Sequence, residues 1–424
     1  MMNWCQENSK FPDDPNEAFV ISHCCSRLKE DTSYFRFVIS TPHLLNTFKT
    51  VKLTCIDSTY KLNWHGFPLT ILGTIDRAKK FHPLAYACTT HETTDDYSFV
   101  FNAAAAAVKK YFGTDFEPTT LVADGADAIR NAFYGSFKSA KIDIMCFAHV
   151  LRNVTKRKFV SQNNKNLLIE DIKKIQMAPD KRTFKQMTKL FLEKWKSIEA
   201  DFVEYFKMQW LGAHCNWYEG AAMYTPSTNN ALEGYNSAIK RKVTLRRRLP
   251  LQEFLGSMKN MAAEKSTDLF KELKLVASEP NISKKLLQTA ALLEQSSFKT
   301  FKAKKSTEHM SSYLLPSSTC AAENANEAYW KAIEKRQWKS FDEFIQYGYQ
   351  QFWFVQLDKT EHWKINSACT CPFFGKEYIC KHIIALAFRE KITECPEAIN
   401  PTELSQKKRG PGRVKSSEKA LLVG

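Results

Sequence analysis

The sequence predicts a mixed α/β fold with an all-helical insertion and a small C-terminal metal-binding module. Three observations support this prediction: short β-branched runs alternate with helical patterns over residues 51–147, charged amphipathic patterns fill residues 150–225, and cysteines cluster near residue 375. The chain has 424 residues, of which 44% are hydrophobic, so it can form a large core and smaller modules.

The sheet is predicted from five short apolar runs with turn-like residues or helical patterns between them. An alanine-rich stretch, 95–112, is expected to be a helix that starts at Thr94 or Asp95 and stops at Gly113. A second, short helix is expected over 125–137. The expected strands are 51–57, 68–76, 82–90, 119–124 and 142–147. Three strands, a helix, a strand, a helix and a strand make a mixed sheet.

The overall charge favours a polyanionic partner such as nucleic acid. The chain has 61 Lys and Arg against 45 Asp and Glu, a net charge of +16. No apolar run reaches the roughly 18 residues that span a bilayer. The polar N-terminus carries no secretory signal, so we expect an intracellular protein without a membrane partner and with reduced cysteines.

Two aspartates stand at matching places in the predicted sheet. Asp57 closes the first strand and Asp124 closes the fourth, where ligands of α/β sheets gather. In a ribonuclease-H-like sheet these two strands are neighbours, which would bring the carboxylates together. Such a pair is unfavourable unless a cation lies between the two groups, and Mg²⁺ is the natural choice. Either residue alone is also typical of a turn, and Asp76 and Asp127 are second choices.

A third acid would complete the site, and it must come from later in the chain. Spacing alone does not choose among the candidates, which are Glu193, Glu199, Glu204, Glu219 and Glu233.

Four motifs in order resemble the transposase domain of Mutator-like elements, within the DDE transposases. They are CIDSTYK, TLVADGADAIRNAF, CFAHVLRN and PSTNNALEGYNSAIK, and the resemblance covers about residues 30–260. It implies a ribonuclease-H-like fold, a metal-binding triad of Asp57, Asp124 and Glu233, and a helical insertion before Glu233. Ser58 departs from the glycine that the family often has there.

The resemblance also implies a reaction and a partner. Two Mg²⁺ or Mn²⁺ ions would activate a water or a DNA 3′-hydroxyl and stabilise the leaving oxygen, so that one site cuts and joins strands. The expected partner is double-stranded DNA, as terminal inverted repeats and target, bound by a homo-oligomer in the nucleus.

Cys146 and His149 fit a Cys-x-x-His pattern that such transposases carry after the second aspartate. Two ligands do not make a structural zinc site, so we expect these residues to pack near or position the catalytic groups.

Basic residues follow Glu233 closely. A run of charged residues is usually a solvated helix face. Next to a site that acts on phosphodiesters, contact with the DNA phosphates is the better interpretation. The predicted DNA-binding residues are Lys240, Arg241, Lys242, Arg246, Arg247 and Arg248.

The sequence CTCPFFGKEYICKH places Cys369 and Cys371 eight residues before Cys380 and His382. Three thiolates and an imidazole suit tetrahedral Zn²⁺, and the pattern resembles a SWIM zinc finger, which binds DNA or protein.

The resulting map has five parts. These are an N-terminal segment 1–50, a transposase domain 51–260 with its insertion at 150–225, a helical connector 261–350, a zinc finger 351–395 and a basic tail 396–424. The N-terminal segment is consistent with a truncated DNA-binding region, although His23, Cys24 and Cys25 form no complete set of metal ligands. The tail resembles an AT-hook or a nuclear-localisation signal. The predicted function is DNA transposition, and the alternative is a transposase-derived DNA-binding regulator that no longer cleaves.

Overall fold

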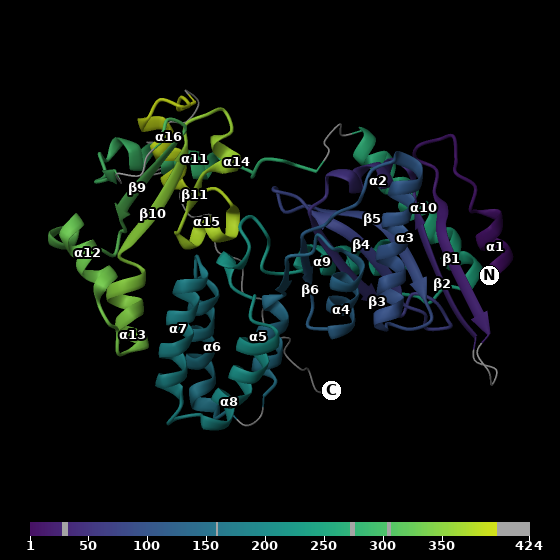
Figure 1. Ribbon diagram of the computed structural model, residues 1–424, viewed down its shortest axis with the longest axis horizontal. Coiled ribbons are helices and arrows are strands. Elements are labelled where there is room, and N and C mark those ends of the chain that lie inside the picture. Colours follow the sequence, from purple (N-terminus) through teal and green to yellow (C-terminus); the bar gives the residue numbers. More distant parts are fainter. Residues whose placement is uncertain (28–32, 158–159, 272–275, 303–306, 397–424) are drawn as a thin grey trace, which may run out of the picture.

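Figure 1 shows a computed structural model of the chain, in which residues 1–27, 33–157, 160–271, 276–302 and 307–396 are described. A lobe built on a large sheet, a helical lobe and a lobe with a second, smaller sheet lie side by side (Figure 1). The basic tail 396–424, for which an AT-hook and a nuclear-localisation signal are both open, lies outside the described part from residue 397 onward.

The large sheet is mixed, and its strand order places the first predicted strand in the middle. From edge to edge the order is β1-β2-β5-β4-β3-β6-β7. Strand β3 pairs antiparallel with β4 and parallel with β6, and β6 pairs parallel with β7. The strands are β1 Phe19–Arg27, β2 Ser33–Ser40, β3 Leu53–Thr59, β4 Leu69–Ile75, β5 Phe81–Thr89, β6 Thr120–Ala123 and β7 Ile142–Met145.

The first 50 residues belong to this sheet, which departs from the separate N-terminal segment that the sequence suggested. β1 and β2 form an antiparallel pair, and β2 continues the sheet beside β5. His23, Cys24 and Cys25 therefore lie within an edge strand.

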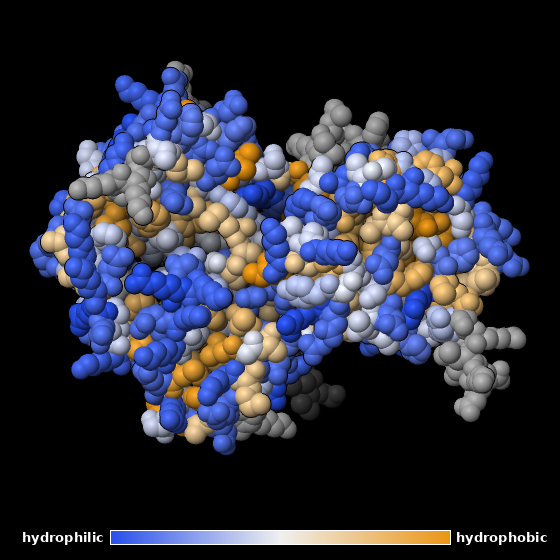
Figure 2. Space-filling model, viewed as in Figure 1, coloured by the Kyte–Doolittle hydropathy of each residue, from blue (hydrophilic) through white to orange (hydrophobic). Residues whose placement is uncertain are grey.

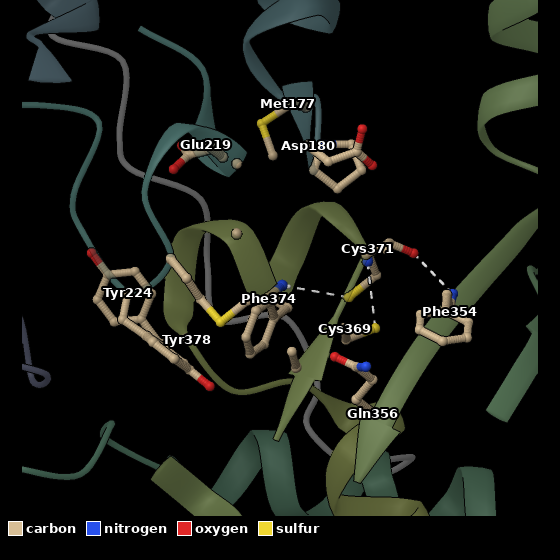
Figure 3. Close-up of a pocket in the computed structure, with 16 residues that line it drawn as sticks. Met177, Asp180, Glu219, Tyr224, Phe354, Gln356, Cys369, Cys371, Phe374 and Tyr378 are labelled. Atoms are coloured by element: carbon tan, nitrogen blue, oxygen red, sulfur yellow. Dashed lines mark hydrogen bonds between the residues drawn. The ribbon is translucent and has the colours of Figure 1, made fainter. Parts of the chain in front are cut away.

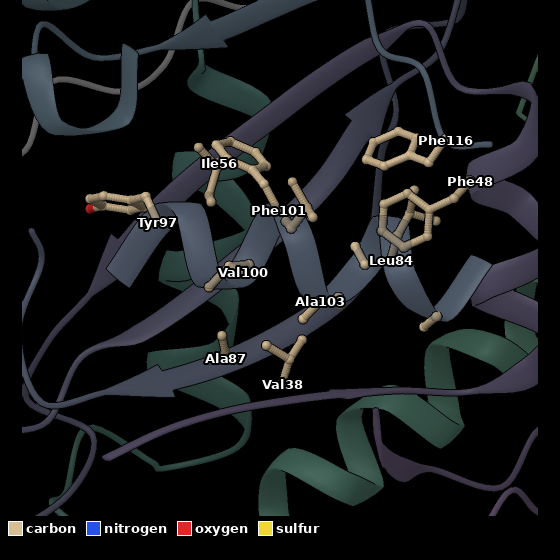
Figure 4. Close-up of a cluster of buried hydrophobic side chains, with 14 of the residues drawn as sticks. Val38, Phe48, Ile56, Leu84, Ala87, Tyr97, Val100, Phe101, Ala103 and Phe116 are labelled. Carbon is tan, nitrogen blue, oxygen red and sulfur yellow. The ribbon is translucent and has the colours of Figure 1, made fainter. Parts of the chain in front are cut away.

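Helices cover both faces of the sheet, and the strand side chains alternate between the two layers. Val38 packs among residues of α3 (Thr94–Phe112), whereas Phe37 and Ile39 join the core on the opposite face (Figure 4). The first layer contains α2 Pro42–Thr47, α3 and α4 Asp127–Ser136, and the second contains α1 Met2–Glu7, α9 Asn230–Lys242 and α10 Leu251–Lys271.

Helices α5 to α8 form a lobe of their own, within the region where the sequence predicted an insertion at 150–225 (Figure 1). Its core contains Phe191, Trp195 and Trp217, all buried. The helices are α5 Phe147–Thr155, α6 Gln162–Gln176, α7 Lys181–Trp195 and α8 Ala200–Met208.

The third lobe is larger than the expected finger, because the region 261–350 is not only helical. It supplies β8 and β9, which extend the sheet β11-β10-β9-β8, and α11, which packs on α16. The elements are α11 Lys284–Gln295, β8 Phe301–Lys302, β9 Met310–Pro316, α12 Glu327–Lys335, α13 Phe341–Phe344, β10 Phe352–Asp358, α14 Trp363–Asn366, β11 Ala368–Cys369, α15 Pro372–Glu377 and α16 Lys381–Arg389.

Hydrophilic residues cover most of the visible surface, with smaller apolar patches between them (Figure 2). Among the described residues, no helix has the length and apolar character needed to cross a membrane.

Candidate active site

The two aspartates lie side by side because of the register between β3 and β6. Cys55 pairs with Val122, and Asp57 and Asp124 each follow two residues later. Neighbouring strands are about 4.8 Å apart, and residues two apart share a face of the sheet. Cys55 and Val122 belong to the core on the α9 and α10 side, so both carboxylates are directed to the layer that contains α9.

The environment of Asp57 is strongly negative. Burial, followed by repulsion from Asp124 and Glu233, raises the pKa of the Asp57 carboxyl from its ordinary value of 3.8 to about 7. Asn236 Nδ2 donates a hydrogen bond of 2.8 Å to Asp57 Oδ2. A carboxyl that repels two others is the setting in which a divalent cation is stabilising.

Glu233 reaches this site from the first turn of α9. Asn236 follows it by three residues, so the two side chains share one face of the helix. Glu233 Oε1 is buried and has no hydrogen-bond partner among the described residues. A free buried carboxylate oxygen, next to two aspartates, is a suitable ligand for a hard cation.

The other four glutamates have different surroundings. Glu193 and Glu204 are exposed on helices of the insertion. Glu199 accepts hydrogen bonds from Ser161 and Asn164 at the start of α6. The remaining one, Glu219, is buried and bonded to neutral side chains, as described below. Of the five glutamates that spacing left open, Glu233 is the one that raises the pKa of Asp57.

The two rival aspartates also have structural surroundings. Asp76 is buried and accepts 2.7 Å and 2.8 Å hydrogen bonds from His82 Nε2 and the backbone N–H of Lys80. Asp127 is exposed at the first residue of α4, where a carboxylate stabilises the helix N-terminus.

Cys146 and His149 lie against Glu233, as the sequence suggested for positioning groups. One ligand atom from each of the three residues falls within 4.8 Å of the others, which suits a metal by distance. However, Arg152 Nη1 lies 3.2 Å from His149 Nε2, and an arginine can only donate. With Nε2 as the acceptor, Nδ1 of the neutral imidazole carries the proton when no metal is bound.

The same contact indicates what His149 does. Its protonated Nδ1 faces Glu233 Oε1 at 3.6 Å, and Arg152 Nη2 lies 3.8 Å from Glu233 Oε2. Cys146 Sγ accepts the backbone N–H of Asn229 at 3.2 Å, immediately before α9. These contacts place Cys146, His149 and Arg152 against Glu233 and the start of its helix.

Magnesium fits the donor set of Asp57, Asp124 and Glu233. All three are oxygen ligands, the site carries excess negative charge, and Glu233 Oε1 accepts no hydrogen bond from the described residues. In two groups of described residues, Cys146–His149–Glu233 and the C-terminal cluster, all ligand atoms lie within 4.8 Å of one another. Asp57, Asp124 and Glu233 do not form such a group, so their carboxylates are farther apart than the ligand atoms of those two groups.

The C-terminal cluster is compact and buried. Ligand atoms of Cys369, Cys371, Cys380 and His382 all lie within 4.8 Å of one another. His382 Nδ1 is 3.8 Å from the sulfur atoms of both Cys369 and Cys380, close to the separation of about 3.5 Å expected between ligands of tetrahedral zinc. Backbone N–H groups of Cys371 and Phe374 donate to Cys369 Sγ and Cys371 Sγ, which favours thiolates (Figure 3). The cluster supports zinc binding.

The predicted DNA-binding residues lie at the far end of α9 and beyond it. The helix stops at Lys242, and the arginines lie in a turn in which Leu245 and Arg246 have positive φ. Five of the six are exposed, with Lys240 half-buried, and none forms an ion pair with another described residue.

Sequence reasoning missed three polar groups around the acids. Asn236 bonds to Asp57, and Arg152 lies beside Glu233. Glu92 adds a further negative charge near Asp57 and accepts a 3.2 Å hydrogen bond from the Tyr97 hydroxyl. The helical spacing of three residues, from Glu233 to Asn236 and from His149 to Arg152, is the signal that identifies two of them.

Three family models match the chain. They are the MULE transposase domain at residues 53–153, the Mutator family of transposases at 118–309, and the SWIM zinc finger at 353–391. The chain carries a Mutator-type transposase domain followed by a SWIM zinc finger. No curated protein matches it in a sequence comparison.

The Mutator-type domain includes all three acids, because the two transposase models together span residues 53–309. The SWIM model includes all four residues of the C-terminal cluster. A transposase domain acts on DNA, so nucleic acid is the partner of this chain, in agreement with its net charge of +16.

Proposed function

We propose that the chain is a DNA transposase that cleaves and joins strands at element ends by metal-dependent phosphoryl transfer, with Asp57, Asp124 and Glu233 as metal ligands. The observation that carries the proposal is that burial, together with repulsion from Asp124 and Glu233, raises the pKa of Asp57 to about 7, although the first two acids are 67 residues apart in the chain and the last two are 109 apart. The same repulsion would be relieved by Mg²⁺ or Mn²⁺.

The strand arrangement supports a ribonuclease-H-like assignment for the sheet. Three antiparallel strands, β5, β4 and β3, are followed across the sheet by the parallel strands β6 and β7. The first aspartate lies on the interior strand β3 and the second follows its parallel neighbour β6, which is the placement that a two-carboxylate metal site needs.

Each residue has a separate task in the proposed mechanism. The three carboxylates would hold the divalent cations, whose chemistry when bound would be to activate a water or a DNA 3′-hydroxyl and to stabilise the leaving oxygen. Asn236 fixes the rotamer of Asp57 through its hydrogen bond. His149 and Arg152 hold Glu233 in place from α5. The protein thus contributes mainly position and charge.

The basic turn after α9 is the proposed contact for the DNA backbone. Its arginines are exposed, and the turn is tied to the loop after β3 because Trp64 N donates to Leu249 O and Leu249 N donates to Leu62 O. Trp64 itself is 64% exposed, so an aromatic ring stands beside the arginines, where a nucleotide can stack.

The proposal includes three further points that follow from the transposase assignment. The DNA would be the terminal inverted repeats of the element and its target, two or more copies of the chain would act together on it, and the reaction would take place in the nucleus.

A cleavage assay tests the proposal. Purified protein is incubated with Mg²⁺ and with DNA that carries the terminal repeats flanking its own gene. We expect strand cleavage by the wild type, and none by Asp57→Asn, Asp124→Asn or Glu233→Gln. Glu193→Gln, which removes an exposed carboxylate from α7, is the matched control and keeps full activity.

Two outcomes contradict the proposal. Full cleavage by any of the three variants removes that residue from the site. Binding of terminal-repeat DNA by the wild type without cleavage in Mg²⁺ or Mn²⁺ would instead identify a DNA-bound regulator.

A further inference from the structure

The zinc finger contacts the segment that leads into the helix of Glu233. This segment, residues 219–228, connects the helical lobe to α9 and has a single 3₁₀ turn, Glu219–Ala221. Tyr224 in its middle has a positive φ of 59°, which a tyrosine adopts only when surrounding contacts hold it. We call residues 219–228 the connecting segment.

Tyr224 is held from three sides. Its hydroxyl donates a 2.8 Å hydrogen bond to Ser367 O, two residues before the first zinc ligand. Its ring packs edge-on against Phe374 and Tyr378 of the finger, with centroids 5.8 Å and 6.1 Å away (Figure 3). The guanidinium of Arg77, from the turn after β4, lies 3.7 Å from the ring centroid.

Helix α15 of the finger also approaches the connecting segment very closely. A Cβ at Gly375 would lie 3.0 Å from Glu219 Cβ, so only glycine fits without displacing the segment. Figure 3 shows Glu219 directly beside this helix. A salt bridge of 3.2 Å between Lys79 and Glu377 adds a link from α15 to the turn after β4.

On its other side, the connecting segment is bonded to the elements that hold Glu233. Glu219 Oε1 accepts hydrogen bonds from Gln176 Nε2 at 2.6 Å and Ser227 Oγ at 2.9 Å. Ser227 O accepts the backbone N–H of Phe147 at 2.8 Å, at the start of α5. Asn229, whose carbonyl accepts the N–H of Glu233, bonds to Cys146 in the same region.

We propose that the zinc finger is an intramolecular support for the active site, which holds the connecting segment and thereby the first turn of α9. Helix α15 begins at the zinc ligand Cys371, so its position depends on the cluster. Zinc loading is then coupled to the order of the Glu233 turn. The catalytic consequence rests on the proposed function, but the coupling itself does not.

Hydrogen exchange of the full-length, zinc-loaded protein, measured by mass spectrometry without DNA or Mg²⁺, tests the coupling. Gly375→Val pushes α15 away from Glu219, and Tyr224→Phe removes the hydroxyl that bonds to Ser367 O and to Arg77 while keeping the ring. We expect amides at 229–236 to exchange about fivefold faster in Tyr224→Phe, and more in Gly375→Val, because a hydrogen bond of this kind contributes about 1 kcal/mol. Zinc content stays at one equivalent.

Phe373→Ser is the matched control. Phe373 lies on the same helix but is 49% exposed. This variant should leave exchange at 229–236 unchanged.

A second measurement separates this inference from the proposed function. Cleavage by Tyr224→Phe should fall about fivefold to tenfold in kcat, while its affinity for DNA stays within twofold. Unchanged exchange at 229–236 in zinc-loaded Tyr224→Phe and Gly375→Val overturns the support role, whatever the cleavage result. Faster exchange in a protein that cleaves no DNA keeps the support role and refutes the proposed function instead.

Discussion

Replacing Asp57 by asparagine should make the metal-free protein more stable. The pKa of Asp57 is about 7 in the folded chain, against an ordinary value of 3.8. Each unit of pKa corresponds to about 1.4 kcal/mol, so the ionised carboxylate lowers the free energy of unfolding by about 4 kcal/mol at pH 8. Asparagine carries no charge and keeps an oxygen that accepts the hydrogen bond from Asn236. We expect a gain of about 2–4 kcal/mol, which is several degrees in the unfolding midpoint.

The pH dependence of this gain has a defined sign. A carboxyl whose folded pKa is raised binds more protons in the folded than in the unfolded state between pH 4 and 7. Wild-type stability should therefore rise, relative to Asp57→Asn, as the pH falls from 7 towards 4. The difference between the two proteins is largest above pH 7 and nearly absent at pH 4.

Thermal unfolding at pH 8 and pH 4, followed by fluorescence with the zinc finger loaded, measures both effects. Asp13→Asn, which removes an exposed carboxylate, is the control and should change the midpoint little at either pH. Addition of 10 mM Mg²⁺ should stabilise the wild type by about 1.4 kcal/mol if the site binds with a Kd of about 1 mM, and should stabilise Asp57→Asn less. An Asp57→Asn variant that is less stable than the wild type at pH 8 would refute the repulsion argument.

Three further predictions concern DNA contact, positioning and zinc. Replacing Arg246, Arg247 and Arg248 by glutamine should weaken DNA binding and reduce the slope of the logarithm of the DNA-binding constant against the logarithm of the salt concentration by about 2–3. Fluorescence anisotropy of labelled DNA at several salt concentrations measures this slope, and an unchanged slope would mean that these arginines do not contact DNA phosphates. Asn236→Ala should lower kcat about 10–100-fold without changing DNA affinity, because it frees the rotamer of Asp57, and equal activity would exclude that role. Cys380→Ser should lose zinc and unfold the third lobe at lower temperature, measured by metal analysis and calorimetry; retention of one zinc would exclude Cys380 as a ligand.

The sequence predicted the central part of the fold because its strands are fully buried. β4 and β5 are buried along their whole length, so they appear as continuous apolar runs between turn residues. β1 is an edge strand, half-exposed at Ser22, His23 and Cys24, and its apolar signal is correspondingly weak. β9 has buried serines, Ser311 and Ser312, where a typical buried strand has apolar residues. Its sequence therefore shows no continuous apolar run, and the region around it was predicted to be helical.

The site could be predicted only in part. The strand order brings Asp57 and Asp124 together, so residue type and spacing were sufficient for an expectation. The choice of Glu233 needed the family motif, because five glutamates were compatible with spacing. The contacts of Arg152 with Glu233 and of Tyr224 with the finger join segments far apart in the sequence, and no local pattern predicts them.

The charge of Asp57 also bears on the choice between a transposase and a DNA-bound regulator. Its ionised form lowers stability by about 4 kcal/mol at pH 8, a large part of the 5–15 kcal/mol that is typical of a folded domain. A regulator that only binds DNA would gain stability from asparagine at this position. A phosphoryl-transfer site needs the carboxylate, because the burial and the repulsion that destabilise its ionised form are what make cation binding favourable. Glu233 Oε1, which accepts no hydrogen bond from the described residues, could then bind the metal, and the exposed arginines beyond α9 could bind the DNA phosphates. The loss of stability caused by an ionised Asp57 therefore favours a transposase over a DNA-bound regulator.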